Sequence, residues 1–283
     1  MKKIIVFGAT GMAGHVVYHY LNELGSYTMY NTSYRNKLTT DSIICDVLKT
    51  EEVAQMLKMI SPDYIINCIG ALINESRASP DNAVYLNAFF PNYLVRIANE
   101  IGSKLIHIST DCVFNGKKGA YGEDSFRDAD DVYGRSKALG EINGERHLTL
   151  RTSIIGPELK PRGEGLFDWF MHQSSEVNGY TDAFWSGIST LELAKSIEKA
   201  LNYNLSGLLH VTNGVKISKY ELLQLLNLNF KNDSVTIKPT DKYRVDKSLT
   251  KSKVFEFEVP GYNCMLQELK EWINQHNLYK YNR

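Results

Sequence analysis

Short apolar runs alternate along most of the chain with stretches whose apolar residues recur every three or four positions. The first strand-like runs are 4–7, 26–35, 42–47, 63–71 and 104–110. The first helix-like stretches are 15–21, 50–60 and 81–101. The runs 63–71 and 104–110 are almost continuously apolar, as in strands buried on both faces of a parallel sheet. The alternation predicts an α/β fold with a doubly wound parallel sheet of about seven strands.

The second half of the chain continues this pattern less regularly. Strands are expected at 147–156 and 207–213, and helices at 133–142, 190–201, 219–226 and 264–276. Thr50 and Thr190 are the expected N-caps of their helices. We predict a main domain over residues 1–156, to which 185–213 return. A smaller, discontinuous α+β domain over 157–184 and 214–283 would bind the substrate.

Three glycines follow the first apolar run at steps of three. Gly8 permits a tight turn, Gly11 lacks the Cβ that would block a pyrophosphate, and Gly14 lets the next helix pack closely. A helix N-terminus placed there offers free N–H groups to phosphates. The spacing differs from G-x-G-x-x-G, and a plain turn between strand and helix is the alternative. We expect a dinucleotide cofactor here.

Charge and cysteine content narrow the function classes. Lysine and arginine number 32, as do aspartate and glutamate, so no nucleic-acid or membrane partner is expected. The cysteines have no CxxC pair and the histidines no HExxH spacing, so we expect free thiols and no metal site. No signal peptide or membrane span is recognised, which favours a cytoplasmic protein. The sequence leaves open whether the protein forms a homodimer.

The reactive candidates are Thr110, Tyr133 and Lys137. Thr110 ends a buried strand, and ligands of open α/β sheets bind outside the carboxyl ends of strands. Tyr133 and Lys137 share one helix face, where the ammonium is expected to lower the pKa of the phenol toward neutrality. A packed tyrosine with a solvated lysine is the alternative. A second Tyr-x-x-x-Lys, Tyr243 and Lys247, is interpreted as solvated surface.

The end of the second strand indicates which nicotinamide cofactor is used. NAD enzymes usually place an acid there to accept the ribose hydroxyls, whereas a 2′-phosphate requires a cation. Residues 31–37 contain Ser33, Arg35 and Lys37 and no acid. They predict NADP(H) over NAD(H), unless Arg35 and Lys37 are ordinary surface charges.

Several motifs together resemble the extended short-chain dehydrogenase/reductase family, and most closely its dTDP-4-dehydrorhamnose reductase branch. They are GATGMAG (8–14), NCIGA (67–71), YLNAFFP (85–91), STDCVFNG (109–116), YGRSKALGE (133–141) and LRTS (150–153). The resemblance implies a Rossmann sheet and NADPH-dependent reduction of a nucleotide-linked 4-keto-6-deoxy sugar for cell-surface polysaccharide synthesis. Tyr133 would donate the proton, Thr110 would hold the substrate oxygen, and Lys137 would bind the nicotinamide ribose.

The resemblance also supplies binding residues. Those for the cofactor are Gly8, Thr10, Gly11, Met12, Ala13, Gly14, Ser33, Arg35, Asp46, Val47, Ile69, Gly70, Ala71, Asn87, Tyr133 and Lys137. Those for the nucleotide-sugar substrate are Ser109, Asp111, Cys112, Ser153, Phe167 and Trp185. The aromatic cluster Phe167, Trp169 and Phe170 either stacks on a nucleobase or packs internally. A substrate diphosphate is expected to pair with Arg151, Lys160 and Arg162. For Lys160 and Arg162 the alternative is a position at the surface.

Two alternatives remain. Cys112 stands where the branch usually has Tyr and where dehydratases usually carry an acid, so reduction is favoured over dehydration. A nucleotide-sugar 4-epimerase would use the same three reactive residues. A non-catalytic regulatory subunit, like the β subunit of methionine adenosyltransferase, would keep the fold while its reactive residues were free to change.

Overall fold

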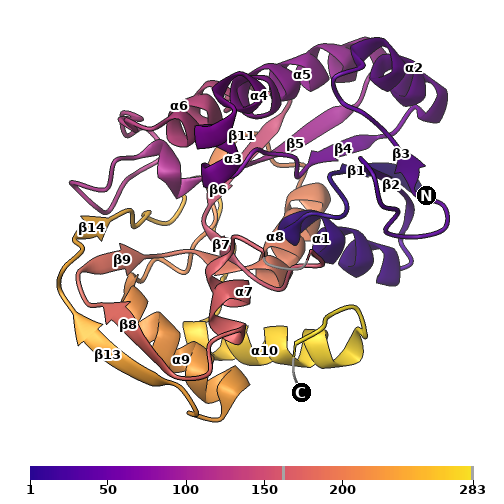
Figure 1. Cartoon of the computed structure of the whole chain (residues 1–283). Helices are drawn as coiled ribbons and strands as arrows, with labels where there is room; N and C mark the ends of the chain where they lie inside the picture. Colours follow the sequence, from indigo (N-terminus) through magenta and orange to yellow (C-terminus); the bar gives the residue numbers. More distant parts are fainter. Residues whose placement is uncertain (161–162, 282–283) are drawn as a thin grey trace.

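A seven-stranded, all-parallel sheet forms the centre of the computed structural model, which describes residues 1–160 and 163–281 (Figure 1). Its strand order is β11-β6-β5-β4-β1-β2-β3. The strands are β1 (Lys2–Phe7), β2 (Tyr27–Ser33), β3 (Ile43–Ile44), β4 (Tyr64–Asn67), β5 (Lys104–Thr110), β6 (Leu148–Thr152) and β11 (Gly207–His210). The order reverses at β1 and β4, so the predicted doubly wound Rossmann sheet is confirmed.

Helices cover both faces of this sheet because its strands are apolar on both faces. On β1, Ile4 and Val6 face one core, and Ile5 and Phe7 face the other. The first core includes α1 (Met12–Glu23) and α8 (Thr190–Asn202), and the second includes α2 (Thr50–Ile60) and α5 (Phe90–Ile101). Figure 1 shows α3 (Ile73–Ala78), α4 (Pro80–Val84) and α6 (Val132–Leu139) on the same side as α5. The sheet is therefore buried between two helical layers.

A smaller α+β part lies beyond α1 and α8 (Figure 1). Its helices are α7 (Leu166–Met171), α9 (Lys219–Lys231) and α10 (Tyr262–Gln275). β8 (Glu176–Tyr180) pairs with β13 (Thr236–Thr240), and β9 (Ala183–Trp185) pairs with β12 (Ile217–Ser218) and β14 (Val245–Asp246). These pairings join segments from before and after β11. The exact domain boundaries stay a prediction.

The structure corrects several details of the predicted elements. Thr50 and Thr190 are already helical, and the N-caps are Lys49, without a side-chain bond, and Ser189, whose Oγ accepts the Glu192 N–H. A cap needs extended backbone, which Ser189 has. The predicted helix 81–101 is interrupted by a π-helical turn, Tyr85–Phe89.

The predicted strand 147–156 is likewise divided. β6 ends at Thr152, and β7 (Ile154–Ile155) leaves the sheet to pair with β10 (Ile188–Ser189). Ser153 lies between the two strands and so marks the point where the chain passes from the sheet toward the smaller part. Within the described part of the chain, no helix has both the length and the apolar character needed to cross a bilayer.

Candidate active site

The glycine turn between β1 and α1 has the tight geometry that the sequence predicts. Gly8 has φ +76°, a conformation that side chains disfavour. A Cβ on Gly14 would lie 2.2 Å from the Gly8 carbonyl oxygen, so only glycine lets α1 approach the turn this closely. No side chain caps the N-terminus of α1, and its first turn has no acid. Its free N–H groups and positive dipole end can therefore hold an anion.

Two clefts open at the carboxyl ends of the parallel strands, on either side of the loop 68–70. The central cleft, about 240 Å³, lies over β4, β5 and β6, and the edge cleft, about 430 Å³, lies over β1, β2 and β3. The predicted residues lining the central cleft are Met12, Ala13, Ile69, Gly70, Ser109, Thr110, Cys112, Tyr133, Lys137 and Ser153. Those lining the edge cleft are Gly8, Thr10, Gly11, Ser33, Arg35, Asp46, Val47, Ile69 and Gly70.

The three reactive candidates meet in the central cleft. Thr110 ends β5, where its Oγ1 donates to Asp111 Oδ1 at 3.1 Å and accepts the Cys112 N–H at 3.1 Å. Tyr133 lies in the first turn of α6, which Asp131 caps by accepting the Gly134 N–H at 2.7 Å. Lys137 follows one turn later and lines the same cleft. The arrangement brings a hydroxyl, a phenol and an amine to one opening.

The pKa of Tyr133 is raised and not lowered, so that expectation is wrong. Burial is the main cause, and Cys112 and the acids Asp111 and Asp131 add to it, while the hydrogen bond with Thr110 opposes it. The Lys137 ammonium donates instead to the Ile108 carbonyl at 2.7 Å. Tyr133 is therefore protonated at neutral pH, as a proton donor must be.

Some predicted cofactor contacts lie behind the cleft wall. Asn87 is fully buried in the π-helical turn, where its Oδ1 accepts the Ala71 N–H at 2.9 Å and its Nδ2 donates to the Ala71 carbonyl and to Ser136 Oγ. Ala71 is equally buried. Asn87 therefore joins the cleft loop to α6 and positions it, without lining either cleft. Gly14 also acts through packing alone.

Three predicted substrate contacts do not line the central cleft either. Phe167 is 1% exposed and packs edge-to-face on Phe230 and Tyr281, because α7 turns this side of the helix toward α9. Asp111 is 5% exposed and lies behind Thr110. Trp185 is 3% exposed. Phe170 is also buried and only Trp169 is substantially exposed, so the aromatic cluster is mainly packing.

Comparison with known proteins decides the family. The model of the RmlD substrate binding domain family matches residues 1–272. The chain belongs to this family. The expected relationship to dTDP-4-dehydrorhamnose reductases and to the extended short-chain dehydrogenase/reductase fold is thereby confirmed.

Individual relatives of this RmlD-family chain differ in function. The dTDP-4-dehydrorhamnose reductase of Shigella flexneri is 31% identical over 165 residues, spanning 54% of this chain and 51% of that protein. Methionine adenosyltransferase 2 subunit beta of Xenopus laevis is 26% identical over 237 residues, spanning 78% and 70%. A crystal structure of dTDP-4-dehydrorhamnose reductase from Bacillus anthracis in complex with NADP has a TM-score of 0.82 at 22% identity, covering 98% of this chain and all of that one. This last likeness shows the shared fold.

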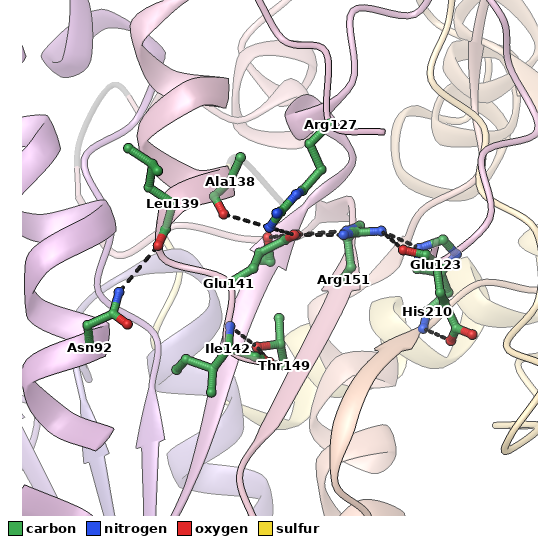
Figure 2. A network of polar contacts seen from close by, with 11 residues as sticks. Asn92, Glu123, Arg127, Ala138, Leu139, Glu141, Ile142, Thr149, Arg151 and His210 are labelled. Atoms are coloured by element: carbon green, nitrogen blue, oxygen red, sulfur yellow. Dashed lines mark hydrogen bonds and ion pairs between the residues drawn. The ribbon is translucent and has the colours of Figure 1, made fainter. Parts of the chain in front are cut away.

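Arg151 of this RmlD-family chain does not reach the clefts, contrary to expectation. It is 1% exposed and donates from Nε and Nη2 to both carboxylate oxygens of Glu141, at 2.7 and 2.6 Å (Figure 2). Glu141 also accepts from Ser109 Oγ at 2.7 Å and from Arg127 at 3.2 Å. Ser109 directly precedes Thr110, and Glu141 follows the helix of Tyr133 and Lys137. The ion pair therefore fixes β5 against α6.

His210 on β11 continues this network (Figure 2). Arg151 Nη1 lies 2.9 Å from His210 Nε2 and can only donate, so Nδ1 carries the ring proton and donates to the Thr250 carbonyl at 3.0 Å. Burial and the Arg151 charge lower the pKa of His210 to about 4. Sequence reasoning gave Glu141 and His210 no role, although Glu141 belongs to the YGRSKALGE motif.

The remaining lysine predictions have mixed outcomes. Lys160 is exposed, as one of its two alternatives predicts, and it also lines the edge cleft, while Arg162 lies outside the described residues. Of the second Tyr-x-x-x-Lys, Tyr243 is 52% exposed, as predicted, but Lys247 is partly buried and its charge interacts with Cys112, which lines the central cleft. The pairing of β14 with β9 brings it there, which no local pattern indicates.

Proposed function

We propose that this chain is a cytoplasmic, NADPH-dependent reductase of a nucleotide-linked 4-keto-6-deoxy sugar that serves cell-surface polysaccharide synthesis. The observation that carries the proposal is that Thr110, Tyr133 and Lys137 line one cleft together with Met12 and Ala13, which follow the glycine turn. Its family and the dTDP-4-dehydrorhamnose reductase relative support this choice.

The side chains present fit a dinucleotide. Ser33 Oγ is buried with no hydrogen-bond partner among the described residues, and it borders the edge cleft where a ribose or its phosphate would lie. The uncapped N-terminus of α1 borders both clefts, with Gly11 lining the edge cleft and Met12 the central one, and it suits a pyrophosphate. A bound NADPH would supply the hydride for the keto carbon.

The residues of the central cleft then provide the remaining steps. The hydroxyls of Thr110 and Tyr133, which line the same cleft, would hold the keto oxygen of the substrate. As negative charge develops on that oxygen, the protonated Tyr133 donates its phenolic proton. The Lys137 ammonium, which donates to the Ile108 carbonyl and lines the same cleft, would hold the ribose hydroxyls of a bound cofactor.

The rate should depend on pH through Lys137. Burial lowers the pKa of Lys137 to about 8, although Glu141 and Cys68 oppose the shift. The amine is charged below this pH and neutral above it, so kcat/KM is expected to fall as pH rises through 8. A pH profile with saturating NADPH measures this. A profile that stays flat well above pH 8 would remove the Lys137 charge from the mechanism.

The preference for NADPH is assigned to Arg35, whose guanidinium lies 4.9 Å from the Tyr34 ring centroid at the edge cleft. We expect Arg35→Gln to weaken NADPH about tenfold, the loss of one charge-assisted hydrogen bond to phosphate, and to leave NADH almost unchanged. Fluorescence titration of both cofactors measures this. Lys37→Gln is the control, because Lys37 donates to the Thr40 carbonyl away from the cleft. Equal losses for both cofactors would contradict the assignment.

A regulatory subunit is the second candidate, because methionine adenosyltransferase 2 subunit beta matches 78% of the chain. The experiment that separates the two is NADPH oxidation, followed by absorbance, with a panel of nucleotide-linked keto sugars. Consumption of NADPH with one of them supports the reductase. Tight NADPH binding without turnover on any of them favours the regulatory subunit.

A further inference from the structure

After α10 the chain turns back toward α1, and this segment (276–281) reaches the glycine turn through one side chain (Figure 1). Its Tyr279 is hydrogen-bonded to His15 of α1 at 2.9 Å, and the two rings meet edge-to-face with their centroids 5.5 Å apart. His15 in turn bonds the Gly11 carbonyl through Nδ1 at 2.7 Å. Gly11 is the N-cap of α1 and lines the edge cleft.

The protons in this series of hydrogen bonds have one arrangement. A carbonyl can only accept, so His15 Nδ1 carries the ring proton and donates to Gly11. Burial lowers the pKa of His15 to about 4, so the ring holds only this proton near neutral pH and Nε2 accepts from the Tyr279 hydroxyl. The Tyr279 oxygen accepts the Trp272 Nε1–H at 3.3 Å. The three side chains therefore form a continuous series that ends on the glycine turn.

His15 determines how one peptide unit of the glycine turn is oriented. The Gly11 carbonyl and the Met12 N–H belong to the same planar unit, so fixing the carbonyl fixes the direction of the N–H. The backbone bond from the His15 N–H to this carbonyl is long, at 3.3 Å, so the side-chain bond at 2.7 Å is the shorter restraint. Met12 is the first residue of α1, where an N–H has no intrahelical acceptor and is available to an anion.

A second tyrosine of the segment 276–281 holds other residues beside the same turn. The Tyr281 hydroxyl donates to Asp168 Oδ1 at 3.1 Å and accepts the Glu158 N–H at 2.9 Å. Glu158 lines a cleft of about 290 Å³ together with Gly11 and Met12. The segment after α10 therefore fixes both the glycine turn and a residue that borders the space next to it.

We infer that Tyr279, acting through His15, positions the glycine turn for the pyrophosphate of the cofactor, so that the segment after α10 sets the affinity for the dinucleotide. The inference rests on the proposed function only in that a nicotinamide dinucleotide binds at this turn. Neither residue lines the central or the edge cleft, so both are positioning residues. Loss of their hydrogen bonds should weaken NADPH and NADH alike, because both carry the pyrophosphate.

The test measures the dissociation constants of NADPH and NADH by fluorescence titration. Tyr279→Phe removes only the hydroxyl and is expected to raise both constants about fivefold. The KM for NADPH should rise to the same degree, with kcat at saturating NADPH unchanged. Tyr20→Phe is the matched control, because Tyr20 also lies on α1 but its hydroxyl donates to Glu198 Oε2 at 2.6 Å. It should leave both constants unchanged.

Two substitutions of His15 separate its bond to the turn from its packing. His15→Leu removes the bond to the Gly11 carbonyl and should raise both dissociation constants about tenfold. The amide of His15→Asn can still donate to a carbonyl four residues earlier, as Asn92 Nδ2 does to the Ala88 carbonyl at 2.8 Å. His15→Asn should therefore retain most of the affinity, although it loses the contact with Tyr279.

Each outcome decides the inference. Equal losses for both dinucleotides in Tyr279→Phe and His15→Leu, with affinity restored in His15→Asn, support it. It is overturned by unchanged constants in Tyr279→Phe, by a loss confined to NADPH, by His15→Asn as weak as His15→Leu, or by a wild type that binds neither dinucleotide. A lower free energy of unfolding in urea with unchanged affinity would assign these contacts to stability alone. Failure of the reductase proposal is seen separately, as absence of NADPH oxidation with every keto sugar by a wild type whose dinucleotide affinity still depends on Tyr279.

Discussion

Tyr133→Phe is expected to lower kcat by about 10³-fold, within the range attributed to a positioned general acid. The phenol lines the central cleft beside Thr110 and Lys137, and burial raises its pKa, so it carries a proton at neutral pH. Phenylalanine keeps the ring and its packing, so NADPH affinity should stay nearly unchanged. Steady-state reduction of a keto-sugar substrate and fluorescence titration of NADPH measure the two quantities.

Tyr243→Phe is the matched control for this variant. Tyr243 also lies four residues before a lysine, but it is 52% exposed, and its ring is tilted against that of Tyr180 with the ring centroids 5.5 Å apart. Its substitution should leave kcat unchanged. If Tyr133→Phe retained the wild-type rate, or if both variants lost activity equally, Tyr133 would not be the proton donor. A loss of NADPH affinity to the same degree as kcat would instead indicate a disturbed cofactor site.

Local patterns predicted the framework of this molecule well. β1, the glycine turn and α1 follow one another in sequence, so hydrophobic spacing and Gly8 were sufficient to locate them. The same holds for Thr110, Tyr133 and Lys137, because a strand end and one helix face determine where they lie. Secondary-structure elements and residue positions that depend only on nearby residues could therefore be predicted from the sequence.

Partners across the fold could not be predicted in this way. In the sequence Arg151 is a cation on a strand with no visible partner. In the structure Glu141, which follows α6, lies beside it and accepts its hydrogen bond. Lys247 looks like surface until β14 pairs with β9. Phe167 looks like a ligand contact until α9 and the C-terminal residues cover it. In each case tertiary packing determines which residues a charged or aromatic side chain contacts. No local pattern in the sequence indicates these contacts.

The largest stability effect is expected for Glu141→Gln, which should lower the free energy of unfolding by about 3–5 kcal/mol. The side chains of Glu141 and Arg151 are 0% and 1% exposed, so the substitution leaves the guanidinium buried without its counter-charge. Urea denaturation measures the change. Glu100→Gln removes an exposed pair with Lys58 at 3.4 Å and should cost less than about 1 kcal/mol.

A second variant separates the pair's charge from its packing. Glu141→Met/Arg151→Met removes both charges and should cost less than Glu141→Gln alone, because no unpaired ion remains. The free energy of unfolding of the wild type should also depend on pH. Burial raises the pKa of Glu141, but the hydrogen bonds and charge of Arg151 outweigh it, so the pKa lies below its ordinary 4.5. The stabilisation is therefore complete above pH 4.5 and is lost as pH falls through the lowered value.

Glu141→Gln should also affect the rate of the reaction, through Ser109. Its Oγ donates to Glu141 Oε1, and the next residue on β5 is Thr110. Glu141→Gln should therefore reduce kcat at temperatures where the variant is still folded, with NADPH affinity less affected, because the edge cleft lies on the far side of the loop 68–70. If the folded variant kept the full rate, the ion pair would serve stability alone, and Thr110 would be positioned by its own bonds to Asp111 and Cys112.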